Sequence, residues 1–119
     1  MRRRGTYGGE MTFEEVIDSF RATYPDYGDV TKPQHGYCQH AVRKFSLYCV
    51  NAGYPHVYEF YTDQPENPAP EIYRNGSRVH GIASLPDCYV DWTARQYDPT
   101  LPYPLILWKK DLKRRKDDK

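Results

Sequence analysis

The stretch GYCQHAVRKFSLYCVNAG, residues 36–53, decides the fold, because it carries the signals for one complete amphipathic helix. Apolar residues recur in it at steps of three and four, as in a helix with one buried face. They are Ala41, Val42, Phe45, Tyr48 and Cys49. Gly53 is a natural residue to follow a last helical turn. The pattern predicts a helix from about Cys38 to Gly53, with Cys38 on the apolar stripe at its beginning.

The position of Cys38 favours a reactive thiol. Exposed N–H groups and the positive end of the helix dipole stabilise a thiolate at a helix start. A histidine that is held by a carboxylate can take the proton from such a thiol. His80 and Asp91 follow in the chain as the two partners. The sequence therefore predicts a triad in which Cys38 is the nucleophile, His80 the general base and acid, and Asp91 the group that orients His80.

The remaining pattern predicts a second helix and an antiparallel sheet. Thr12-Phe13-Glu14-Glu15 is a capping box, and the helix that it begins should reach about Tyr24, before Pro25. Its apolar face consists of Phe13, Val16, Ile17 and Phe20. The expected strands are 56–61, a hairpin over 71–80 around Asn75-Gly76, 88–93 and 104–108. Two helices followed by a meander indicate an α+β fold.

Length and charge indicate one domain with basic ends. A chain of 119 residues suits a single core, which we assign to residues 11–108. Residues 1–10 are expected to be a disordered basic N-terminus, and 109–119 a basic C-terminal tail. Since the formal net charge is only +1, the body between these ends is acidic. An acidic body repels a phosphate backbone and disfavours nucleic acid as a partner, although the basic ends leave an acidic partner open.

The cysteine usage indicates a reducing compartment. Three cysteines are an odd number without regular spacing, which argues against a disulfide framework. Cys49 and Cys88 are expected to be structural residues of the core. No apolar run reaches the roughly 18–20 residues that a membrane helix requires. The sequence therefore predicts a cytoplasmic protein that makes no membrane contact.

The spacing of His80 and Asp91 places them on neighbouring strands in one of two registers. If the turn centres on Leu85-Pro86, the two residues lie directly opposite each other. If Pro86-Asp87 forms a two-residue turn, they are diagonal neighbours on the same face. Opposite side chains have Cβ atoms about 4.5–5.5 Å apart, and diagonal ones about 7–8 Å. Direct pairing allows a hydrogen bond easily, whereas diagonal pairing stretches it.

Three motifs in this order resemble a known superfamily. They are Gly36-Tyr37-Cys38, the isolated His80, and Val90-Asp91-Trp92-Thr93-Ala94-Arg95-Gln96-Tyr97 with Pro99. The set resembles the papain-like and transglutaminase-like cysteine superfamily, and within it the small papain-fold toxins and protein-glutamine deamidases. The resemblance covers roughly residues 34–108. It implies a catalytic cysteine at a helix N-terminus packed on an antiparallel sheet, in a toxin or a phage effector.

The resemblance also implies an activity and further site residues. The oxyanion would be bound by the Cys38 backbone N–H and by the side chain of Gln34, while Trp92 and Gln96 would line the site or finish the strand. The implied activity is hydrolysis of an amide in a protein or peptide substrate through a thioester, without a cofactor. Deamidation of a protein glutamine is the leading reaction, and peptide cleavage or transglutaminase-type acyl transfer are the alternatives.

Two other classes compete with this interpretation. A zinc site would draw on His35, Cys38, His40 and Cys88. These residues lack the repeated ligand pairs of structural zinc sites, so no metal is predicted. The other class is a non-catalytic module that binds protein, or nucleic acid by stacking on its tyrosines. His35, His40 and His56 are expected at the surface.

Overall fold

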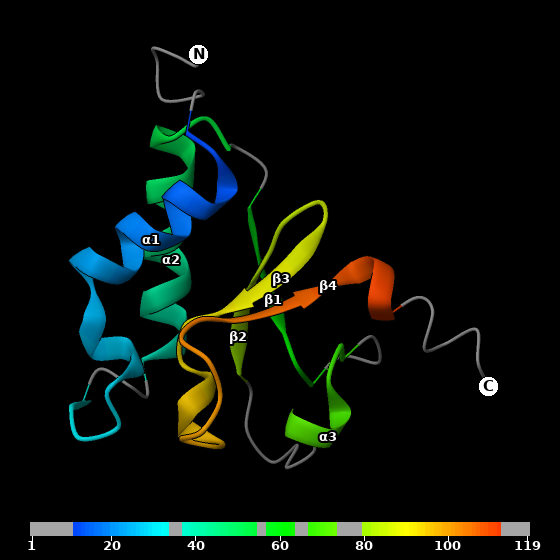
Figure 1. Ribbon diagram of the computed structural model, residues 1–119. Coiled ribbons are helices and arrows are strands. Elements are labelled where there is room, and N and C mark those ends of the chain that lie inside the picture. Colours follow the sequence, from blue (N-terminus) through cyan, green and yellow to red (C-terminus); the bar gives the residue numbers. More distant parts are fainter. Residues whose placement is uncertain (1–10, 34–36, 55–56, 64–66, 74–79, 113–119) are drawn as a thin grey trace.

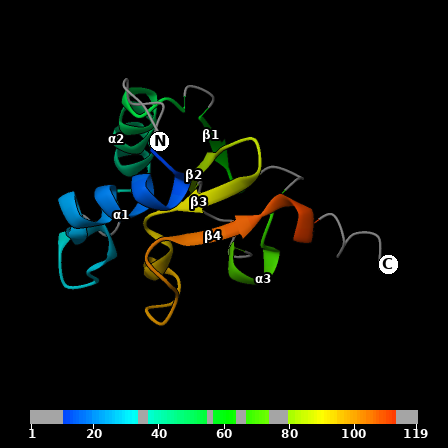
Figure 2. The ribbon, with the colours of Figure 1, turned by 45° about the horizontal axis from the view of Figure 1, so that its top comes forward.

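Two long helices lie on one face of a four-stranded antiparallel sheet, and a short third helix lies on the other face (Figure 1). The computed structural model describes residues 11–33, 37–54, 57–63, 67–73 and 80–112. The turned view keeps α1 and α2 together and α3 apart from them (Figure 2). The predicted α+β class, with helices packed on an antiparallel sheet, is therefore confirmed.

Helix α1 (Phe13–Thr23) begins at the predicted capping box. The Thr12 hydroxyl accepts a hydrogen bond from the Glu15 N–H at 3.1 Å, and the Glu15 carboxylate accepts one from the Thr12 N–H at 2.9 Å. These two bonds satisfy donors that a helix start otherwise leaves free. The chain then turns into the 3₁₀ helix η2 (Pro25–Gly28). Val16, Ile17 and Phe20 are the buried face of α1.

Helix α2 (Cys38–Asn51) begins at Cys38, as predicted, and of the expected stripe it buries Ala41, Val42, Phe45 and Cys49, with Tyr48 partly buried. No side chain caps its N-terminus at Tyr37, so the first backbone N–H groups are not used by a cap. Gly53 has a φ of 91°, in the left-handed region that favours glycine. Beyond it the Tyr54 N–H donates to the Cys49 carbonyl at 2.7 Å, which closes the helix end.

The sheet is a meander of four short strands in the order β1-β2-β3-β4. They are β1 (Tyr58–Tyr61), β2 (Gly81–Ser84), β3 (Cys88–Asp91) and β4 (Leu105–Trp108). The predicted strand 88–93 ends two residues early, because the chain turns into the 3₁₀ helix η4 (Ala94–Gln96). Each strand pairs antiparallel with the next.

The predicted hairpin over 71–80 is wrong in its first arm. Residues Pro70–Tyr73 form the short helix α3, and the turn residues Asn75 and Gly76 lie outside the described residues. Proline suits a first helical position, because its φ is preset and its missing N–H is not needed there. The Asn67 side chain also accepts a hydrogen bond from the Ala69 N–H at 2.9 Å. The predicted strand 71–74 is therefore replaced by a helical turn over its first three residues, and β1 pairs with β2.

The two faces of the sheet have separate cores. The larger core joins α1 and α2 to one face and includes Phe20, Phe45 and Trp92. The smaller core joins α3 to the other face through Ala69, Tyr73 and Ile82. His80 directly precedes β2, and Asp91 ends β3. The end of the sheet where these two residues lie is therefore the place where both layers can contribute side chains.

Candidate active site

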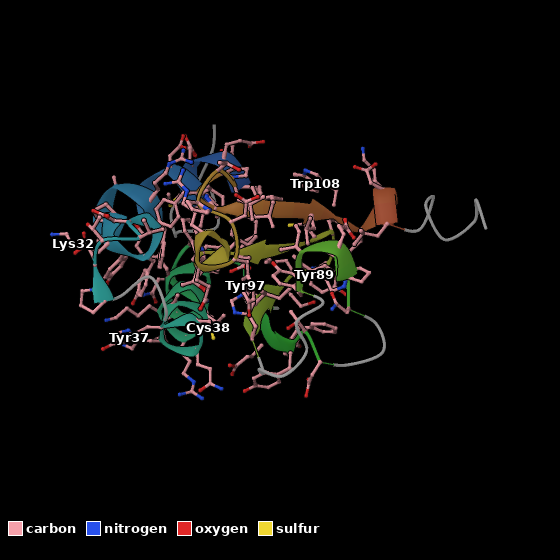
Figure 3. The ribbon with its side chains drawn as sticks, turned by 90° about the horizontal axis from the view of Figure 1, so that it is seen from below. Lys32, Tyr37, Cys38, Tyr89, Tyr97 and Trp108 are labelled. Carbon is pink, nitrogen blue, oxygen red and sulfur yellow. The ribbon has the colours of Figure 1, made fainter. Side chains whose placement is uncertain are left out.

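Cys38 is the half-buried first residue of α2, and its thiol faces the start of β2. The Gly81 N–H donates a hydrogen bond to the Cys38 Sγ, with 3.4 Å between nitrogen and sulfur. The His80 side chain acts on the same thiol, because it lowers the pKa of Cys38. Figure 3 shows Cys38 at the near end of α2, with Tyr97 on the neighbouring segment. The nucleophile proposed from the sequence thus meets its proposed base.

His80 is fully buried, with 1% of its surface exposed, and it is held from several sides. Its Nε2 lies 2.8 Å from the Asp91 Oδ2. The ring lies 5.2 Å from the Tyr73 ring and 4.8 Å from the Tyr97 ring, between centroids. Because Nε2 is engaged by the carboxylate, Nδ1 is the nitrogen that would serve the thiol, and the Gln96 Nε2 also lies 3.3 Å from it. The three predicted catalytic residues, which we call the relay, therefore lie together at one end of the sheet.

The register between β2 and β3 is the diagonal one of the two alternatives. Ala83 lies opposite Val90, and the Leu85 N–H donates to the Cys88 carbonyl at 2.8 Å across a Pro86-Asp87 turn. The direct register is excluded. The hydrogen bond forms nevertheless, because His80 stands just before the regular ladder and its long side chain spans the diagonal.

Asp91 is buried, with 2% exposed, and both of its oxygens accept hydrogen bonds. Oδ1 accepts from the Thr93 N–H at 2.9 Å. Oδ2 accepts from the Tyr73 hydroxyl as well as from His80. A buried carboxylate is stable only when such donors replace water. Asp91 therefore holds His80 in a fixed orientation.

The electrostatics of Cys38 favour the thiolate. Burial alone would raise the pKa of the Cys38 thiol, but the hydrogen bond to His80 and then that from the Gly81 N–H bring the pKa below its usual value. Burial would likewise lower the pKa of His80, but the charge of Asp91, its hydrogen bond and the contact with Cys38 raise that pKa to about 9. Near neutral pH this favours a thiolate beside a protonated imidazole.

Of the site-lining residues, Gln96 contacts the relay. Its Nε2 lies 3.3 Å from the His80 Nδ1 and 3.1 Å from the Thr93 Oγ1. Trp92 packs in the larger core instead, with ring centroids 4.4 Å from Phe20 and 5.2 Å from Phe45. Gln34, the proposed oxyanion donor, lies outside the described residues.

Sequence reasoning missed two contributors to the site, Tyr73 and Gly81. Tyr73 was expected in a strand, but it lies in α3. The sequence signal for this helix is Pro70 at its first position, preceded by Asn67, whose side chain accepts a hydrogen bond from the Ala69 N–H. Gly81 contributes through its backbone N–H, which no residue pattern reveals. A Cβ built on Gly81 would stand 3.1 Å from the Glu59 Oε2, a tight contact that a small shift of the Glu59 side chain can relieve.

The other cysteines and histidines lie apart from the relay. Cys49 and Cys88 are buried free thiols of the larger core, and burial raises the pKa of Cys49 to about 12 and that of Cys88 to about 11. His40 is exposed, and its Nδ1 lies 2.8 Å from the Tyr27 hydroxyl. His35 and His56 lie outside the described residues.

Metal ligands and membrane helices were sought in the same residues. Within the described part of the chain, no three His, Cys, Asp or Glu side chains gather as a metal ion would require. None of the helices there is both long and apolar enough to span a bilayer.

Comparison of the chain with protein-family models, with curated proteins and with solved structures gives no match.

Proposed function

We propose that this protein is a cysteine-dependent amide hydrolase of the papain-like and transglutaminase-like kind, most simply a protein-glutamine deamidase. The observation that carries the proposal is geometric: the Cys38 Sγ lies 3.4 Å from the nitrogen of Gly81, the residue directly after His80, and the His80 Nε2 lies 2.8 Å from the Asp91 Oδ2. A thiol, an imidazole and a carboxylate in that order are the parts of an activated nucleophile. The lowered pKa of Cys38 supports the same role.

The first half of the reaction would form a thioester. The Cys38 thiolate attacks the carbonyl carbon of a carboxamide, and the negative charge moves to the carbonyl oxygen. The Cys38 backbone N–H at the uncapped start of α2 is the donor for that oxyanion. The protonated His80 then gives its proton to the departing nitrogen as the carbon–nitrogen bond breaks. A primary carboxamide releases ammonia in this step.

The second half would restore the enzyme. A water molecule attacks the thioester carbon while His80 takes one of its protons. The carbon–sulfur bond breaks, the carboxylic acid leaves, and the Cys38 thiolate and the His80 imidazolium are regenerated. On a protein glutamine the net change is hydrolysis of the side-chain amide to glutamate. Peptide cleavage and acyl transfer to an amine use the same relay and are the alternatives.

The state of the three cysteines supports a reducing compartment as the location of the protein. All three cysteines are free, and two of them are buried where an oxidant would disturb the core. This fits a reducing compartment such as the cytoplasm. The partner would be a protein or peptide that carries the amide.

The test uses glutamine-containing peptides and proteins as substrates, with wild type, Cys38→Ser and Cys49→Ser. We expect ammonia release and a glutamine-to-glutamate mass change that Cys38→Ser abolishes and Cys49→Ser retains. Cleaved peptides would indicate the peptidase, and incorporation of an added amine would indicate the transferase. A binding module would give none of these products.

A second experiment tests the nucleophile directly and does not require the substrate to be known. A peptide whose glutamine is replaced by a chloroketone analogue should alkylate Cys38 in the wild type and not in His80→Gln. Mass spectrometry of the digested protein locates the adduct. If Cys38 stays unmodified while the folded protein is intact, the proposal of an activated nucleophile is wrong.

A further inference from the structure

The hydroxyl of Tyr73 reaches the relay from the layer opposite Cys38. Tyr73 ends the short helix α3, only 3% of its surface is exposed, and its hydroxyl donates a hydrogen bond to the Asp91 Oδ2. That oxygen is the one that His80 Nε2 approaches to 2.8 Å. The proposed mechanism uses Cys38, His80 and Asp91 and assigns nothing to this fourth side chain.

The contacts of Asp91 define what Tyr73 adds. The Thr93 N–H, on the same strand end, holds Oδ1 at 2.9 Å. Tyr73 holds Oδ2 from a different element. Thr93 and His80 already engage one oxygen each, so Tyr73 adds a second donor on the oxygen that His80 contacts. This second donor fixes the position of Oδ2 from α3 as well as from β3.

The Tyr73 hydroxyl is a permanent donor. Burial, followed by the charge of Asp91, raises the pKa of Tyr73 far above the range in which proteins work. Since it never ionises there, it always donates to the carboxylate and shares the negative charge that His80 also uses. A shared charge attracts the imidazolium less strongly than an undivided one.

The rings add a second constraint on the imidazole. Tyr73, His80 and Tyr97 form a cluster with centroid distances of 5.2, 4.8 and 5.4 Å. Among the described residues, the titratable groups around His80 are Cys38 from α2, Asp91 from β3, Tyr73 from α3, and Tyr97 after η4. Of the two tyrosines, Tyr73 has a hydroxyl bond to the carboxylate.

We propose that Tyr73 is a positioning residue of the relay: it holds the Asp91 Oδ2 against His80 Nε2 and limits how strongly the carboxylate retains the imidazolium proton. The inference rests on the proposed function, because it assigns Tyr73 a part in the same relay. It connects α3 to the reactivity of a cysteine in the opposite layer.

The test is the titration of His80 in protein labelled with ¹³C-histidine, followed by NMR without substrate. The wild-type midpoint should lie at about 9. Tyr73→Phe keeps the ring and removes the donor, so we expect the midpoint to rise by roughly half to one pH unit. Tyr54→Phe is the matched control, because it removes a hydroxyl whose partner is the Met11 carbonyl. An unchanged midpoint in folded Tyr73→Phe would show that Tyr73 only packs.

A double substitution separates the hydroxyl effect from a general disturbance. In Asp91→Asn the carboxylate charge is gone, so Tyr73→Phe should have little effect on His80. We expect it to move the midpoint of the His80 titration by less than a third of the change that it causes in the wild-type background. Equal shifts in both backgrounds would overturn the inference. Thermal melts of all variants report any loss of packing separately from the titration.

A measurement on the unaltered protein covers the case in which Tyr73→Phe does not fold. The Tyr73 hydroxyl proton should give a slowly exchanging, downfield proton resonance with a cross-peak to the His80 ring. Its absence would contradict the inference. Because these readouts need no catalysis, an inactive Cys38 would refute the proposed function and leave the test of Tyr73 intact.

Discussion

The two ends of α2 carry the same residue with opposite chemistry. Cys38 and Cys49 lie on one apolar stripe of the same helix, yet the pKa of Cys38 is lowered while that of Cys49 is raised to about 12. Burial by itself raises the pKa of both thiols. At Cys38 the side chain of His80 and the N–H of Gly81 reverse the effect, whereas Cys49 faces the apolar core and Cys88. Reactivity therefore depends on the partners that the fold supplies, and neither the helix nor the stripe determines it.

The largest expected effect is the difference in alkylation between these two thiols. At pH 7 iodoacetamide should modify Cys38 at least about a hundredfold faster than Cys49, because only the first is stabilised as a thiolate and accessible. Peptide mass spectrometry after timed quenching gives both rates from one sample.

The substitution His80→Gln should remove most of the difference in alkylation rate between Cys38 and Cys49. We expect the rate at which iodoacetamide modifies Cys38 at pH 7 to fall by about tenfold or more. The pH at which Cys38 becomes half-reactive should move up toward that of an ordinary thiol. Equal rates for Cys38 and Cys49 in the wild type, or a Cys38 rate indifferent to His80→Gln, would remove the basis of the comparison.

An intermediate effect concerns stability against pH. The pKa of folded His80 is raised to about 9 from an ordinary value near 6.5, so its protonated form stabilises the fold fully below about pH 6.5. This stabilisation is lost as the pH rises through about 9. In Cys38→Ser the thiol neither titrates nor raises the His80 pKa, so the loss should be smaller and complete at a lower pH than in the wild type. We expect the free energy of unfolding of this variant to fall by about 2 kcal/mol as the pH rises from 6.5.

The control for this prediction is Cys38→Ser combined with Asp91→Asn, which removes the largest influence that raises the His80 pKa. Urea unfolding at closely spaced pH values measures both proteins. A double variant with the same pH slope as Cys38→Ser would show that the His80–Asp91 pair is not the source.

The smallest expected effect is that of Gly81→Ala. The new Cβ would meet the Glu59 Oε2 at 3.1 Å, a contact that the flexible carboxylate can relieve by a small shift. The hydrogen bond from the backbone N–H of residue 81 to the Cys38 Sγ is kept. We therefore expect less than about a threefold change in Cys38 alkylation and a loss of about 0.5 kcal/mol in stability. A tenfold slower alkylation would mean that the space at Gly81, besides its N–H, sustains the reactive thiol.

The apolar periodicity and the capping signals sufficed for both long helices. The bond between Thr12 and Glu15 and the positive φ at Gly53 are local features, since each depends on residues within one turn. Local rules also place Cys38 at the first position of α2. His80 and Asp91 were proposed as its partners from the spacing of two neighbouring strands and from the resemblance of three motifs.

The nonlocal features of the site were decided by the tertiary structure. The sequence allowed two registers for His80 and Asp91, and the structure has the diagonal one, with Ala83 opposite Val90 and a turn at Pro86-Asp87. Tyr73 joins the relay only because α3 packs against the sheet, whereas the Asn75-Gly76 turn signal predicted a strand there. Short-range propensity acts within a few residues, whereas hydrogen bonds to a buried carboxylate are made between elements that only folding brings together.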